Sequence, residues 1–174
     1  MPYSIREMQR TDVPLLEKLL ADYMRETYER EWEGSSEKLE RDALGGLLKI
    51  IVAENESEIV GFIAWITTYD LHHCLKGGEV IDFYVKPKAR GYGVGLLMLA
   101  YLAAEIQKHD GKFLKGGAVE NPSVRRFYSR IAMIFPNGDC YVSGRAFRHL
   151  AGLSGKSVRE IVRNLPETTW NYDA

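Results

Sequence analysis

The sequence predicts a single α/β (α+β) domain in which strands and helices alternate along the chain. Short apolar runs typical of strands are separated by segments that have the apolar spacing of helices. With 174 residues, of which 45% are hydrophobic, the chain is long enough to bury one apolar core without disulfides or metal. We find no linker, repeat or low-complexity segment, and therefore expect one domain over residues 1–174.

Six strands are expected where apolar and β-branched residues gather between polar or glycine-containing turns. They cover residues 3–8, 48–53, 59–67, 80–85, 113–119 and 139–147. The polar stretch 54–58 joins the second and third strands as a hairpin. Gly116 and Gly117 weaken the fifth strand but permit a bulge or a close backbone approach.

Five helices are expected between these strands. Thr11 is expected to cap the first helix. Its inward stripe would be Leu16, Leu19, Leu20, Tyr23 and Thr27. The other four helices cover residues 37–44, 96–109, 122–132 and 157–165. The helix at residues 96–109 is apolar on nearly every side, as expected for a helix that lies against a sheet.

Charge and cysteine content exclude several classes of protein. A formal net charge of −1 argues against a general nucleic-acid surface. Cys74 and Cys140 lie too far apart in the sequence to suggest a disulfide framework or a pair of zinc ligands. In the run His72-His73-Cys74, neighbouring side chains alternate in direction and cannot all bind one ion, so no metal site is expected. Without a signal-peptide core or a spanning apolar run, we expect a soluble, cytoplasmic protein with no membrane partner.

The most informative stretch is the glycine-rich run Arg90-Gly91-Tyr92-Gly93-Val94-Gly95. It follows the strand at 80–85 and opens the helix at 96–109. Glycines remove the side chains that would block close approach, so backbone N–H groups and the positive end of the helix can face an anion. The run therefore predicts a site for a phosphorylated ligand.

Two common nucleotide motifs do not fit this run. A dinucleotide fingerprint would need glycine where Leu96 or Met98 stands. A phosphate loop ending in Gly155-Lys156-Ser157 would need its first glycine at Leu150.

The pattern that fits is Arg-x-x-Gly-x-Gly, followed downstream by the run Asn121-Pro122-Ser123-Val124-Arg125-Arg126-Phe127-Tyr128. In these two motifs the chain resembles the GNAT superfamily of acetyl-CoA-dependent N-acyltransferases. Residues 80–132 look closest to the diamine (spermidine/spermine) acetyltransferases, whose Glu-Asp-Phe-Phe-Val strand is similar to Ile81-Asp82-Phe83-Tyr84-Val85. The resemblance implies a mixed, mostly antiparallel central sheet of about six to seven strands, flanked by about four to five helices.

The resemblance also implies acetyl-CoA as co-substrate and a set of residues that contact it. Strand 80–85 would bind the pantetheine arm through its main chain, and the glycine-rich turn would bind the pyrophosphate. The implied contacts are Phe83, Tyr84, Val85, Arg90, Gly91, Tyr92, Gly93, Val94, Gly95 and Asn121. Arg90 is otherwise a solvated turn residue, and Asn121 is otherwise an ordinary helix cap.

The expected reaction needs an acid and a base. A lysine-like amine has a pKa near 10.4, so keeping it neutral at pH 7 costs about 4.6 kcal/mol. A phenol can protonate the departing thiolate, and the resemblance places Tyr128 in that role; its alternative is aromatic packing.

The base is less sharply defined. Asp82 matches the related strand, whereas Ile81 replaces the glutamate expected there and puts polyamine substrates in doubt. Glu79, a water chain and a residue of the segment 26–33 are the alternatives.

The expected acceptor is a primary amine of a small molecule. Residues 28–33 interleave carboxylates with aromatics, which suits a cationic amine, although a solvated helix end explains them equally well. A protein lysine or N-terminal acetyltransferase and a non-catalytic acyl-CoA-binding module are the alternatives. We also expect a homodimer, with apolar surface offered by Tyr141, Val142, Phe147 and Trp170.

Overall fold

The computed structural model describes residues 3–56, 58–117 and 122–164 of the chain. These residues divide into two compact units. The first unit takes residues up to Trp65 together with Asp82–Met98, and the second takes Ile66–Ile81 together with the chain from Leu99 onward.

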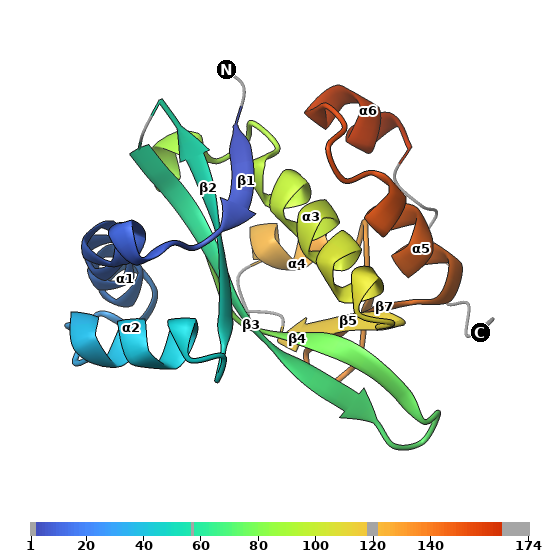
Figure 1. The fold of residues 1–174 in the computed structure, drawn as a ribbon. Coiled ribbons are helices and arrows are strands. Elements are labelled where there is room, and N and C mark those ends of the chain that lie inside the picture. The colour runs from blue at the N-terminus through green and yellow to red at the C-terminus, as the bar shows by residue number, and fades with distance from the viewer. Residues whose placement is uncertain (1–2, 57, 118–121, 165–174) are drawn as a thin grey trace. The chain divides into compact units, whose positions relative to one another are not determined.

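Seven strands form one mixed, mostly antiparallel sheet in the order β1-β2-β3-β4-β5-β7-β6, which confirms the expected fold class (Figure 1). The strands are β1 (Ser4–Glu7), β2 (Lys49–Asn55), β3 (Glu58–Asp70), β4 (Leu75–Val85), β5 (Phe113–Gly117), β6 (Met133–Ile134) and β7 (Asp139–Ser143). The described α-helices are α1 (Val13–Tyr28), α2 (Ser36–Leu44), α3 (Val94–Lys108), α4 (Pro122–Tyr128), α5 (Gly144–Gly152) and α6 (Val158–Arg163). Within the described ranges, none of these helices is long and apolar enough to cross a bilayer.

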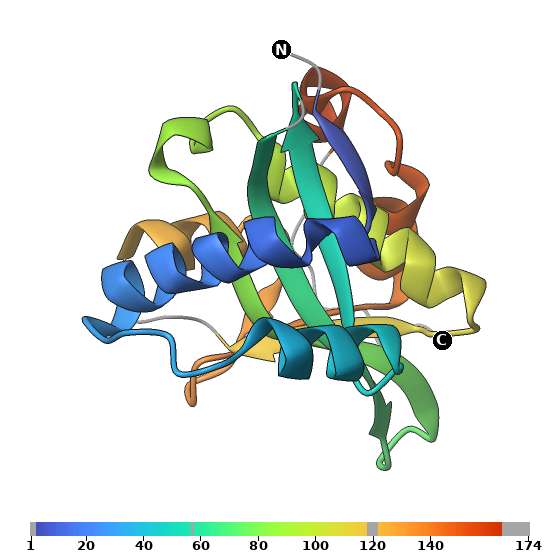
Figure 2. The ribbon, with the colours of Figure 1, turned by 60° about the vertical axis from the view of Figure 1, so that its left-hand side comes forward.

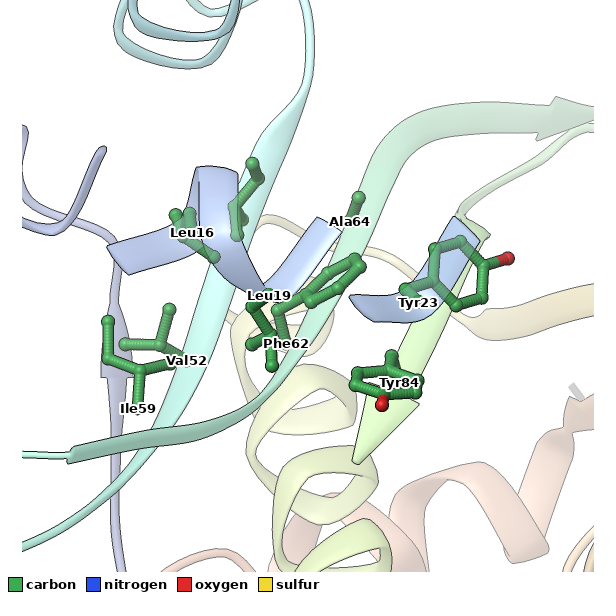
Figure 3. Packing of buried hydrophobic residues seen from close by; sticks show 9 residues of the cluster. Leu16, Leu19, Tyr23, Val52, Ile59, Phe62, Ala64 and Tyr84 are labelled. Carbon is green, nitrogen blue, oxygen red and sulfur yellow. The ribbon is translucent and has the colours of Figure 1, made fainter. Parts of the chain in front are cut away.

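In the first unit, α1 and α2 cover β2 and β3 (Figure 2). The apolar spacing of α1 places Leu16, Leu19 and Tyr23 against Val52 and Phe62 (Figure 3). A helix with one apolar stripe is stabilised mainly by this burial rather than by its own propensity. The core of the first unit therefore fixes where α1 ends and which side chains its last two turns present.

The start of α1 differs from the expectation. Thr11 does not cap it, because residues Arg10–Asp12 form a short 3-10 helix first. Asp12 is buried and accepts hydrogen bonds from the Gln9 backbone N–H at 2.7 Å and from Arg6 Nη1 at 2.6 Å. Thr27 was expected in the inward stripe and is exposed instead, as are all of residues 25–28 in the last turn of the helix.

The second unit contains a helix that the sequence pattern did not predict. The expected strand 139–147 stops at Ser143, and α5 begins at Gly144, whose φ of 55° breaks the extended run. Within α5 the side chains of Phe147, Leu150 and Ala151 are buried at helical spacing. This correction also removes Phe147 and Val142 from the expected dimer surface, because both are buried within their own chain.

The tip of the β3–β4 hairpin also belongs to the second unit. Both strands are longer than expected, and the carboxylate of Asp70 accepts hydrogen bonds from the backbone N–H groups of His72 and His73. The phenol of Tyr141 donates to the same carboxylate at 3.0 Å. Cys74, beside this turn, is exposed, whereas Cys140 is buried, and burial raises the pKa of its thiol to about 11.

Candidate active site

The glycine-rich run forms a tight turn between β4 and α3. Gly91 and Gly93 both have φ of +82°, a left-handed conformation that side chains other than glycine disfavour. The N–H of Leu97 donates to the Gly93 carbonyl at 3.1 Å, so α3 begins directly after Gly93 and the N–H groups ahead of Leu97 precede its hydrogen-bond ladder. Gly95 lies in the first turn of α3, and Tyr92 is exposed on the turn. The local geometry is that of an anion site at a helix start.

Arg90 ties this turn to β4 and to α1. Its Nε donates to the Val85 carbonyl at 2.7 Å, and its Nη1 donates to Glu26 Oε1 at 2.6 Å. The phenol of Tyr84 donates to the other oxygen of Glu26 at 2.8 Å. Arg90 and Tyr84 together hold the pKa of Glu26 below its usual range. Arg90 is therefore engaged by protein groups on two sides.

Asp82 lies in a separate hydrogen-bonded chain of the same unit. The phenol of Tyr23 donates to Asp82 Oδ1 at 2.6 Å, and the phenol oxygens of Tyr23 and Tyr28 are 3.3 Å apart. Tyr23 is 8% exposed, whereas Tyr28 is 53% exposed. Burial, followed by the hydrogen bond to Asp82, raises the pKa of Tyr23 far above its ordinary value. A half-buried carboxylate is thus connected to an open phenol through a buried one.

Glu79, the alternative base, is held elsewhere. It pairs with Lys115 across the β4–β5 ladder, with Oε2 and Nζ at 2.9 Å. This ion pair balances the negative charge of Glu79.

The main chain of β4 reaches Val85. Over the described residues its parallel ladder with β5 runs from Gly77↔Phe113 to Val80↔Gly116, and β4 continues from there to Val85. Phe83 and Val85 are half-buried in this extension, and Tyr84 is buried.

Tyr128 ends α4 in the second unit and is half-buried. It lines a cavity of about 30 Å³ with mostly apolar walls. The other lining residues are Val80, Leu99, Leu114, Lys115, Gly116, Gly117, Ile131, Ala132, Cys140, Val142 and Leu150. Burial raises the pKa of Tyr128 well above that of a free phenol, so it stays protonated at neutral pH. Asn121 lies outside the described residues.

Sequence reasoning missed Tyr23 as a partner of Asp82, whereas Glu26 belonged to the segment 26–33 that was considered for the base. The signal for Tyr23 was its place in the inward stripe of α1, which was interpreted only as core packing. Glu26 and Tyr84 also line an open hollow of about 630 Å³ in the first unit, with Asp22, Arg25, Lys86, Pro87 and Lys88. Over residues 3–56, 58–117 and 122–164, no group of three His, Cys, Asp or Glu side chains is placed to hold a metal ion.

Solved structures with the same fold include an integron cassette protein and several acetyltransferases. An integron cassette protein from V. cholerae is 21% identical, with a TM-score of 0.66, 87% of this chain covered and 98% of that one. A ribosomal-protein-alanine N-acetyltransferase from Brucella melitensis biovar Abortus is 20% identical, with a TM-score of 0.63 and coverage of 78% and 94%. An aminoglycoside acetyltransferase from an uncultured soil metagenomic sample is 16% identical, with a TM-score of 0.63 and coverage of 72% and 84%.

A comparison with proteins of curated function finds no match. The sequence pattern of the Acetyltransferase (GNAT) family, however, matches residues 13–133, which is well over half of the chain. The matched range contains α1, the whole of β4 and the glycine-rich turn, so it includes the geometry described above. The protein therefore belongs to the GNAT family of acetyltransferases and is an acetyl-CoA-dependent N-acetyltransferase.

Proposed function

We propose that the enzyme transfers an acetyl group directly to a primary amine of a small molecule, with Asp82 as the final proton acceptor and Tyr128 as the proton donor. The observation that carries this proposal is the half-buried Asp82 carboxylate, connected through Tyr23 to the exposed phenol of Tyr28. Carboxylates and aromatic faces together attract a cationic amine through charge and through the ring quadrupole.

Acetyl-CoA supplies the acetyl group as a thioester. The glycine-rich turn offers backbone N–H groups for the pyrophosphate, which the left-handed Gly91 and Gly93 and the start of α3 support. The extended conformation of β4 up to Val85 supports main-chain binding of the pantetheine arm by Phe83, Tyr84 and Val85. Arg90 can reach a phosphate only in exchange for Glu26, so we assign it chiefly to holding the turn.

Removal of the amine's proton precedes attack, because only the neutral lone pair is nucleophilic, and Asp82 receives that proton. Tyr128 then donates its phenol proton to the departing thiolate, and the second proton, which the nitrogen loses as the amide forms, restores the phenol. Burial raises its pKa, so the phenol keeps its proton in the resting enzyme but is a weaker acid than a free phenol. The role therefore rests on the place of Tyr128 in its motif rather than on its acidity. A thiolate with an ordinary pKa of about 8.5 is a better leaving group once it is protonated.

A thiol-release screen with purified protein tests the function. Acetyl-CoA is combined in turn with spermidine, cadaverine, kanamycin, free lysine and a peptide with a free N-terminus. We expect release that depends on a small amine and an acetylated amine in the mass spectrum. Release with the peptide alone would identify a protein acetyltransferase instead. Binding of acetyl-CoA by calorimetry without release for any amine would identify a non-catalytic acyl-CoA-binding module.

A further inference from the structure

We infer that Tyr28 and Tyr23 form a two-phenol proton path from the acceptor amine to Asp82, and that Tyr28 is the group that contacts the amine. This inference rests on the proposed function and assigns its proton-transfer step to particular atoms. All three side chains belong to the first unit, with α1 supplying both phenols and β4 the carboxylate.

The direction of proton transfer along the path follows from the single O–H proton that each phenol can donate. A phenol has one O–H to donate and oxygen lone pairs to accept. Tyr23 gives its proton to Asp82 Oδ1 at 2.6 Å, so at the 3.3 Å contact with Tyr28 it can only accept. Tyr28 is therefore the donor in that contact, and its own oxygen lone pairs are available to a further donor. A protonated amine is such a donor.

Exposure marks the entrance to the path. Tyr28 is 53% exposed, whereas Tyr23 is 8% exposed and packs edge to face against Tyr28, with ring centroids 5.7 Å apart. An amine that arrives from solvent meets Tyr28 first. Glu26, the nearby carboxylate of α1, is held by Tyr84 and Arg90 and does not join the path. Among the described residues, Asp82 thus accepts a hydrogen bond from Tyr23 and is connected through it to Tyr28.

The transfer balances without any other reactant. The ammonium gives one proton to the Tyr28 oxygen, Tyr28 passes its O–H proton to Tyr23, and Tyr23 passes its own to Asp82. The products are a neutral amine, two intact phenols and a neutral carboxylic acid. The raised pKa of Tyr23 agrees with this arrangement, because a phenol that resists ionisation at rest relays a proton rather than storing a charge.

Steady-state kinetics on the amine chosen by the thiol-release screen test the path. Tyr28→Phe and Tyr23→Phe should each lower kcat at pH 7 by on the order of 10²-fold, while KM for acetyl-CoA stays unchanged. The loss should shrink as the pH approaches the amine's own pKa near 10.4, because a neutral amine no longer needs the path. Tyr23→Phe combined with Asp82→Asn should cost no more than Asp82→Asn alone, since both break one chain.

Tyr141→Phe is the matched control. It removes a phenol that donates to a carboxylate, Asp70, at a similar distance of 3.0 Å, but in the second unit and outside the proposed machinery. We expect unchanged kcat at every pH. Tyr28→Phe is the safer of the two test variants for folding, because the hydroxyl that it removes belongs to an exposed side chain.

A second readout does not depend on turnover. In proton NMR the Tyr23 hydroxyl should give a slowly exchanging downfield signal that is lost in Tyr23→Phe and shifts in Asp82→Asn but persists in Tyr28→Phe. No amine-dependent release by the wild type would overturn the proposed function, and the path with it. Wild-type release that Tyr28→Phe leaves intact at pH 7 would overturn the path alone, and so would absence of the hydroxyl signal.

Discussion

Tyr128 lines an apolar cavity, and burial raises its pKa, so its phenol is protonated at neutral pH and is a weaker acid than a free phenol. Tyr128→Phe should lower kcat by roughly 10²–10⁴-fold with little change in acetyl-CoA affinity, because a group that acts on the departing thiolate stabilises only the transition state. Unlike Asp82→Asn, it should show no recovery at high pH. Calorimetry and steady-state kinetics give the two quantities, and full turnover with chemistry rate-limiting would exclude Tyr128 as the acid.

The pH dependence of wild-type turnover should also reflect the raised pKa of Tyr128. A free phenol has a pKa of about 10, and that of Tyr128 is higher, so activity should not fall through loss of this acid below pH 10.

The buried Asp12 predicts how stability depends on pH. Hydrogen bonds from Arg6 hold its pKa below the usual range in the folded protein. The unfolded chain should have the ordinary value of about 3.9, so the ion pair stabilises the fold above that pH and its contribution disappears as the pH falls through the lower, folded value.

Asp12→Asn should therefore reduce the free energy of unfolding by about 2 kcal/mol at pH 7. The gap to wild type should close in acid, where Asp12 is protonated and resembles the amide. Urea unfolding of both proteins at a series of pH values measures this difference in the free energy of unfolding. Asp42→Asn is the control, since Asp42 pairs with Arg41 at the surface and should give a much smaller gap. A gap for Asp12→Asn that is constant with pH would contradict the assignment.

Among the elements, the glycine-rich turn gives the sharpest test of cofactor binding. Gly91 has φ of +82°, and a Cβ added there would meet no atom within 4 Å, so an alanine is opposed only by backbone conformation. Gly46 has φ of +84° and the same open surroundings. Each Gly→Ala change should cost about 1–2 kcal/mol of stability.

Only Gly91→Ala should also weaken acetyl-CoA binding, by tenfold or more in the dissociation constant, because it disturbs the turn at which the pyrophosphate is proposed to bind. Calorimetry on both variants separates the two effects. Equal affinities would show that the turn does not hold the cofactor. Gly93→Val should act in the same direction, since Gly93 also has φ of +82°, but a valine adds more than the single methyl group that the Gly46→Ala control matches.

Patterns within one element were predicted well, and contacts between elements were not. The apolar stripe of α1 and the continuous apolar surface of α3 were sufficient to locate both helices. Strand β4 was predicted to start at residue 80, whereas it starts at Leu75 and includes Gly77. In the structure a Cβ on Gly77 would lie 2.5 Å from the Phe113 ring, so this glycine makes room for a neighbouring strand.

The same contrast holds for the candidate site: motifs within one element were predicted, and contacts between elements were not. The turn at Gly91, together with Asp82 and Tyr128, came from motifs that each lie within a short stretch of sequence. The partner of Asp82 did not, because Tyr23 stands 59 positions away and meets it only when α1 packs on the sheet. A buried tyrosine in an apolar stripe carries no sign in the sequence that its hydroxyl has a functional neighbour.

At the scale of the whole molecule, we still expect a homodimer, but some of the residues that were expected to form its interface no longer qualify. Val142 and Phe147 are buried, and Trp170 lies outside the described residues. The last strand of the sheet, β6, has only two residues and exposes Met133, so it protects little of the β7 edge. Met133→Lys should weaken the dimer by charging that edge. Sedimentation at several concentrations measures it, and a wild-type mass that stays monomeric would contradict the expectation.

The contrast between the two cysteines matters for how this enzyme is measured. Cys74 is exposed at the hairpin turn, and Cys140 is buried with a raised pKa. A thiol-specific dye should modify the native protein at Cys74 alone, because thiolate character and access govern the reaction. In a thiol-release assay this gives a fast signal of one thiol per chain that does not grow with time or amine. Cys74→Ser should abolish this fast signal and leave the steady rate of coenzyme A release unchanged. In the wild type, Cys74 also offers a single attachment point for a fluorescent reporter on the hairpin.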